Sequence, residues 1–177
     1  IGSPDYDQMI SDHKDYVEAL TLAGAEVINL NELDKFPDGQ FVEDTALCFP
    51  NAAILMRPGA PSRLGEVDEI APKIRELFTK VYEIEEPGHI EGGDILVTGK
   101  EILVGRSART DEKGVSQLLD IVTGLGYVMR EVFTPPEILH FKTDCSLLGP
   151  NEILSTKRLQ ASGCFDGYEV INVADGE

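Results

Sequence analysis

The sequence has no tryptophan, and it is poor in cysteine, in positive charge and in long apolar runs. Its three cysteines, Cys48, Cys145 and Cys164, are an odd number without metal-ligand spacing, so we expect reduced thiols and neither a zinc site nor a disulfide framework. The longest apolar runs, such as 52–56, are far shorter than the roughly 20 residues of a membrane span. Ile1 opens no signal-peptide pattern. We therefore expect a soluble, cytoplasmic protein without a membrane partner.

Positive charge is scarce, because 15 Lys and Arg stand against 32 Asp and Glu, for a formal net charge of -17. Such a surface repels phosphate backbones, so we expect no nucleic acid partner. It would attract a small cationic molecule, although a merely solvated acidic surface is the more ordinary interpretation. The oligomeric state stays open, a homodimer included.

What the sequence does contain is a repeated pattern. The 177 residues, 42% of them hydrophobic, can bury one substantial core, so we expect a single domain over 1–177. Within it, a polar motif, two apolar strands joined by a tight turn, a helix and a further strand recur about every 50 residues. Turn residues separate the two strands of each expected hairpin. The hairpins are expected at 41–56, 90–104 and 139–155, with turns at 50–51, 99–100 and 149–151.

Helices and third strands complete each expected repeat. The helices are expected at 4–23, 62–79 and 110–124, and the strands that follow them at 25–30, 81–84 and 126–132. Ser3 and Pro4 are a typical cap and first-turn proline for the first helix. Segment 167–173 closely copies 24–30, and Glu177 comes before the next polar motif. We therefore expect an incomplete ring of repeats, with chance βαβ alternation in an open sheet as the alternative.

Repeats arranged around an axis would bring their polar motifs together in one site. Asp38, Glu43 and Asp44 lead into the first apolar strand. Because burying unpaired carboxylates is costly, a cationic partner is expected beside them. A guanidinium fits, since it donates paired hydrogen bonds to a carboxylate. An internal arginine, Arg57 or Arg63, is an equal alternative.

The next two repeats supply Glu91 and His140 in the same register, 49 residues apart. Two glycines follow Glu91 and would allow close approach to a ligand, whereas Asp94, at the strand start, is expected to be structural. His140 is expected on or at the mouth of an inward strand, where it could shuttle protons, with a satisfied core histidine as the alternative. His13 and His89 lack this register.

Two arginines, Arg63 and Arg109, occupy equivalent places after the second strand of successive repeats. They could hold an α-carboxylate by paired hydrogen bonds. The alternative is that they enter helices and bond neighbouring carbonyls or Glu66.

Taken together, these motifs resemble the dimethylarginine dimethylaminohydrolases. The family's motifs occur in its order and spacing over essentially the whole chain, at 36–44, 57–63, 91–94, 105–110 and 139–142. Lys142 favours dimethylarginine as the substrate, because arginine deiminases typically carry Asp two residues after the histidine. The resemblance implies a pentein-type α/β propeller of ββαβ repeats with fivefold pseudosymmetry. This chain would hold about three and a half repeats, without the first strand, its lid loop and the C-terminal repeat.

The resemblance also implies roles for the candidate residues. Glu91 and Asp44 would grip the guanidinium, and His140 would be the general acid and base. The supporting carboxylates would be Asp38 and Glu43, and the ligands of the amino-acid carboxylate Arg63 and Arg109. In the family a cysteine thiolate attacks the guanidine carbon, an amine leaves, and water releases citrulline.

No cofactor or metal is implied, and the nucleophile would lie outside this chain. Cys145 is expected to be a small buried hydrophobe. Two alternatives stay open: an arginine deiminase-like or amidinotransferase-like enzyme on another guanidine, and a non-catalytic guanidine-binding or assembly module of the same fold.

Overall fold

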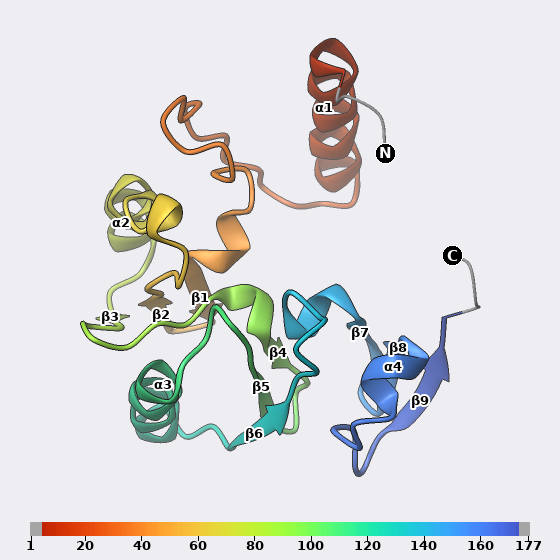
Figure 1. The fold of residues 1–177 in the computed structure, drawn as a ribbon. Coiled ribbons are helices and arrows are strands. Elements are labelled where there is room, and N and C mark those ends of the chain that lie inside the picture. The colour runs from red at the N-terminus through yellow and green to blue at the C-terminus, as the bar shows by residue number, and fades with distance from the viewer. Residues whose placement is uncertain (1–4, 174–177) are drawn as a thin grey trace. The chain divides into compact units, whose positions relative to one another are not determined.

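The computed structural model describes residues 5–173 and divides the chain into two compact units, Ile1–Leu33 and Asp34–Glu177 (Figure 1). None of the described helices is long and apolar enough to cross a membrane.

The first unit contains the helix α1, Tyr6–Leu22. Its N-cap is Asp5, whose carboxylate accepts the N–H of Gln8 at 3.0 Å. The predicted cap at Ser3 and Pro4 lies outside the described residues. The strand predicted at 25–30 is wrong, because these residues form no ladder.

The second unit contains three sheets of identical topology. In each sheet, the first two strands form an antiparallel hairpin and the third pairs in parallel with the second, across a helical connection. The strands are β1 (Ala46–Phe49), β2 (Ala52–Leu55) and β3 (Val81–Glu83); β4 (Ile95–Val97), β5 (Ile102–Arg106) and β6 (Met129–Phe133); β7 (Cys145–Gly149), β8 (Glu152–Ser155) and β9 (Glu169–Asn172). The predicted hairpins and their turns are therefore confirmed.

The helices in the connections are α2 (Glu66–Leu77), α3 (Glu112–Gly124) and the single turn α4 (Lys157–Gln160). The second predicted helix began too early, at 62. Pro61–Arg63 instead form a separate 3-10 helix, η2, and Gly65 caps α2. The third prediction agrees with α3, which Asp111 caps by accepting the N–H of Gly114 at 2.8 Å.

Central strands make the core. All four residues of β2 are buried, as are Ile102, Leu103 and Val104 of β5, which explains their continuous apolar sequence. One apolar cluster joins the first sheet, the second sheet and α3, and it includes Ile54, Ile102 and Leu118. A second cluster joins the second and third sheets. The polar motifs lie at the N-terminal ends of β1, β4 and β7, the first strands of the three sheets.

Candidate active site

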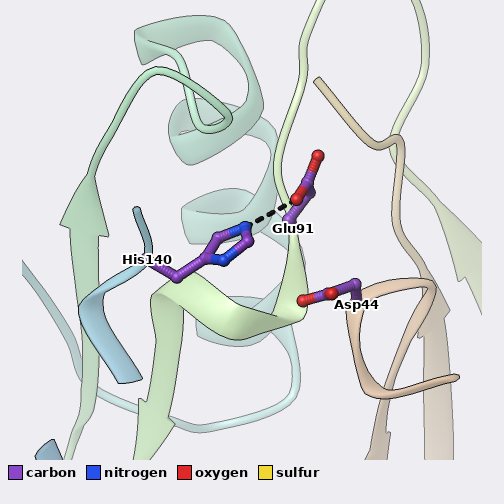
Figure 2. Close-up of side chains that lie close together, drawn as sticks. All are labelled: Asp44, Glu91 and His140. Carbon is purple, nitrogen blue, oxygen red and sulfur yellow. Dashed lines mark hydrogen bonds and ion pairs between the residues drawn. The ribbon is translucent and has the colours of Figure 1, made fainter. Parts of the chain in front are cut away.

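Three short 3-10 helices immediately precede the first strands of the three sheets. They are η1 (Val42–Asp44), η3 (Gly92–Asp94) and η4 (Phe141–Thr143). η3 contacts both of the others. The structure therefore brings together Asp44, Glu91 and His140 from three different repeats, and Figure 2 shows the three side chains lying close to one another.

His140 and Glu91 form a hydrogen-bonded pair, with 2.7 Å between Nε2 and Oε2 (Figure 2). Both residues sit in extended backbone just before a 3-10 helix, so His140 does not lie on a strand. Glu91 is fully buried, and its Oε1 also accepts the backbone N–H groups of Gly59 at 2.9 Å and Ala60 at 3.3 Å. Arg109 Nη1 lies 3.6 Å from the same oxygen.

These contacts determine the charges of the pair. Burial by itself would raise the pKa of Glu91, but the hydrogen bond from His140, the N–H of Ala60 and the charge of Arg109 lower it below its ordinary value. Burial would lower the pKa of His140, but the hydrogen bond to Glu91 and the negative charges of Asp94 and Asp44 raise it. The pair therefore favours a carboxylate beside an imidazolium.

Asp44 is held in place from two sides. Its Oδ1 accepts the N–H of Gly93 at 2.7 Å, and its Oδ2 accepts from Arg63 Nη1 at 2.6 Å. A Cβ on Gly93 would stand 2.8 Å from Asp44 Oδ1 and 3.0 Å from the His140 ring, and one on Gly92 would collide with the Glu43 carbonyl oxygen. The two glycines of 91–94 are required because three motifs crowd against this backbone.

Arg63 is a cationic partner of Asp44 within the chain. The sequence left open whether such an internal arginine or a bound guanidinium would neutralise the carboxylates. Arg63 is only 4% exposed. Its guanidinium donates hydrogen bonds to Asp44, to both carboxylate oxygens of Glu66 and to the carbonyl oxygens of Asp38 and Phe41. Burial would lower the pKa of Arg63, but the hydrogen bonds and charges of Glu66 and Asp44 raise it above its ordinary value. Its binding of a substrate carboxylate stays a prediction.

The remaining candidates lie around this cluster. Glu43 is exposed and forms an ion pair with Lys142. Asp38 is half-buried, in a turn where its carbonyl also accepts the Phe41 N–H at 2.9 Å. Arg109 is half-buried, with its guanidinium turned toward Glu91.

The cysteines do not offer a nucleophile. Burial and the nearby Cys164 raise the pKa of Cys145 to about 12, and its thiol donates to the Phe141 carbonyl oxygen. Cys164 is buried in the same apolar cluster, and burial raises its pKa as well. Cys48 lies exposed on β1, with a pKa that burial raises. A nucleophilic cysteine needs a lowered pKa, so none of the three fits.

The cluster can hold a cation. One ligand atom from each of Asp44, Glu91 and His140 lies within 4.8 Å of the others, which is a donor set that a metal ion could use. A planar guanidinium suits it equally, because two carboxylates can accept paired hydrogen bonds from its N–H groups.

Sequence reasoning missed the backbone donors of Gly59 and Ala60. Gly59 approaches closely, since a Cβ there would stand 2.6 Å from the Arg109 carbonyl oxygen. The run Pro58-Gly59-Ala60-Pro61 was a usable signal of a constrained loop.

Comparisons with known proteins agree with this geometry. The family model described as arginine deiminase matches residues 70–162. The N(G),N(G)-dimethylarginine dimethylaminohydrolase of Pseudomonas aeruginosa is 34% identical over 178 aligned residues, which cover 100% of this chain and 70% of that protein. The enzyme of the same name from Streptomyces coelicolor is 38% identical over 140 residues, 78% of this chain and 54% of that protein.

A solved structure is also similar. A cysteine-to-serine variant of the Pseudomonas aeruginosa protein in complex with citrulline superposes with a TM-score of 0.94 at 34% identity. The superposition covers 99% of this chain and 69% of that one.

Proposed function

Because the chain belongs to the dimethylarginine dimethylaminohydrolase family, we propose that its site binds N-methylated arginine for hydrolysis to citrulline and a methylamine. The observation that carries the proposal is the cluster of Asp44, Glu91 and His140, in which the two carboxylates are buried and the imidazole is half-buried. The relatives named for this reaction and the citrulline complex support it.

The carboxylates have acceptor capacity left for a guanidinium. Each carboxylate offers about four lone-pair sites. Asp44 uses one on each oxygen, and Glu91 Oε2 carries one bond, to His140. We propose that the free sites of Asp44 and Glu91 accept the guanidinium N–H groups, with Asp38 and Glu43 in support. Arg109 and Arg63 would bind the α-carboxylate.

In the proposed reaction, a cysteine thiolate adds to the guanidinium carbon and His140, as the imidazolium, gives its proton to the departing methylamine. The neutral imidazole then takes a proton from water, whose oxygen attacks the same carbon. The carbon–sulfur bond breaks, citrulline leaves, and the thiolate is restored. Glu91 holds the imidazole and balances its charge throughout. We assign the thiolate to none of the three cysteines of this sequence.

Calorimetry tests the binding step. Asymmetric dimethylarginine should bind to the protein, and Asp44→Asn should weaken binding, because the carboxylate charge facing the cation is lost. Asp120→Asn, on the exposed face of α3, is the matched control and should leave binding unchanged. Absence of heat with dimethylarginine would sink the proposal.

A citrulline assay tests the reaction and separates the rivals. Release of citrulline from dimethylarginine and not from arginine supports dimethylarginine as the substrate, whereas the reverse supports a deiminase. Binding without turnover in a protein that has its full complement of cysteines supports the non-catalytic module.

The finer architecture belongs to the same proposal. The three sheets of identical topology support consecutive blades of a pentein propeller with fivefold pseudosymmetry, and 1–177 as one catalytic domain. We also propose a cytoplasmic location, consistent with three free cysteines, and a homodimer. Cell fractionation tests the first, and sedimentation equilibrium of the purified protein tests the second.

A further inference from the structure

Asp94 is a fully buried carboxylate that the proposed reaction does not use. It ends η3 and receives three hydrogen bonds. Its Oδ1 accepts the backbone N–H of Phe141 at 2.9 Å. Its Oδ2 accepts the hydroxyls of Ser107 and Thr110, each at 2.6 Å.

Each donor to Asp94 is one step from a residue of the candidate site. Phe141 follows His140 directly in the chain. The Thr110 hydroxyl oxygen also accepts the backbone N–H of Glu91 at 3.3 Å.

Ser107, the third donor, likewise binds both Asp94 and the backbone of a site residue. The hydroxyl oxygen of Ser107 accepts the backbone N–H of Arg109 at 3.0 Å. A single carboxylate is thus connected to the main chain at Glu91, at Arg109 and directly after His140. Glu91 and Arg109 flank the strands of the second sheet, and His140 precedes the third sheet. Asp94 therefore links parts of the site that belong to two different sheets.

From this network we propose that Asp94, as a carboxylate, is the positioning residue that fixes the distance and orientation of the Glu91–His140 pair. The inference rests on the proposed function and adds a residue to it. Burial raises the pKa of Asp94 above its ordinary value, against the lowering effect of its hydrogen bonds from Ser107, Thr110 and Phe141. The proposed role is that of the carboxylate, because all three partners donate to it. A proton on Asp94 would add a donor where three partners already donate, and it would remove a negative charge that raises the pKa of His140.

The third sheet provides a matched control. Asp144 is placed like Asp94, directly before the first strand of its sheet, and is 3% exposed. Its Oδ2 accepts the hydroxyl of Thr156 at 2.6 Å, just as Asp94 accepts that of Ser107 after β5. Its Oδ1 accepts instead from Arg158 Nη2 at 2.6 Å. Asp144→Asn therefore reports what such a carboxylate contributes to folding alone.

The test compares Asp94→Asn with Asp144→Asn by three measurements. His140 is titrated by NMR, with its signal assigned by its loss in His140→Gln. Thermal unfolding reports stability, and citrulline release reports kcat and KM. Asp94→Asn should lower the pKa of His140, since a nearby negative charge is lost. It should also reduce kcat by about a hundredfold with a smaller change in KM, because the pair moves from its productive geometry.

Asp144→Asn should lower the melting temperature without changing the His140 titration. An Asp94→Asn protein that folds and keeps the parental His140 titration and kcat would overturn the inference. If Asp94→Asn does not fold, Thr110→Val replaces it, since that change removes only the link from Asp94 to Glu91, and the same loss of kcat is expected. Because the NMR titration needs no turnover, a lowered His140 pKa in a protein that binds no dimethylarginine would support Asp94 while refuting the proposed function.

Discussion

The imidazole of His140 is surrounded by carboxylates, and this makes its protonation part of the stability of the fold. Its folded-state pKa is raised above 6.5 by the hydrogen bond to Glu91 and the charges of Asp94 and Asp44, against the effect of burial. A group with a raised pKa stabilises the folded state fully below its unfolded-state pKa. It loses this contribution as the pH rises through the folded-state value.

The free energy of unfolding should therefore fall above pH 6.5 more steeply in the parent than in His140→Gln. Urea unfolding at a series of pH values measures this. His13→Gln, at an exposed position of α1, is the control and should keep the parental slope. Parallel curves for the parent and His140→Gln would contradict the assigned protonation of the pair.

The two glycines after Glu91 lead to a second prediction at this scale. Gly93→Ala places a methyl group against Asp44 and the His140 ring, so dimethylarginine binding should be lost together with about 1–3 kcal/mol of stability. Gly124→Ala is the control, because nothing lies within 4 Å of a Cβ at this last residue of α3. Calorimetry and urea unfolding measure both effects. Unchanged ligand affinity in Gly93→Ala would show that this backbone has room to move.

The repeat of about 50 residues put Glu91 and His140 at equivalent positions, whereas Asp44 was singled out by the resemblance to the dimethylarginine dimethylaminohydrolases. The sequence could not decide the partner of Asp44. Arg63 is three residues from Glu66 and 19 from Asp44, and it bonds both. Which carboxylates an arginine reaches depends on the packing of η2 against η1, and this is set by tertiary structure.

At the scale of elements, the hairpins were predictable because turn residues and apolar runs are local signals. The strand predicted at 25–30 was wrong, although the sequence of 167–173, which does contain a strand, closely resembles it. Residues 169–172 form β9 because β8 offers a parallel edge, with Ile153 opposite Val170. A strand exists only with a partner, so the same sequence pattern gives a strand in one place and an irregular segment in another.

The cap of α3 allows a prediction about an element. Asp111 accepts the N–H of Gly114 and also contacts His89, whose backbone N–H lies 3.2 Å from Oδ1. Asp111→Ala should therefore cost about 0.5–2 kcal/mol, the usual range for a helix N-cap. Asp120→Ala on the same helix should cost nothing, since this residue is exposed and alanine favours helix. Equal urea midpoints for the two variants would contradict a capping role for Asp111.

At the scale of the whole molecule, the net charge of -17 is either a means of attracting cations or only a solvated surface. Salt separates the two, because the Debye length falls from about 30 Å at 0.01 M to about 3 Å at 1 M. Long-range attraction is screened over that range. A contact with the buried Asp44 and Glu91 is screened much less.

Dimethylarginine carries one net positive charge at neutral pH and citrulline carries none, so the two ligands form a matched pair for this test. If the acidic surface attracts substrate, the association rate of dimethylarginine, measured by stopped flow, should fall steeply with added salt, while that of citrulline stays constant. Equal and flat salt dependences would mean that the acidic residues serve solvation alone. In that case, preference for a cationic ligand would come from the buried carboxylates of the site, and Asp44→Asn should abolish it at every salt concentration.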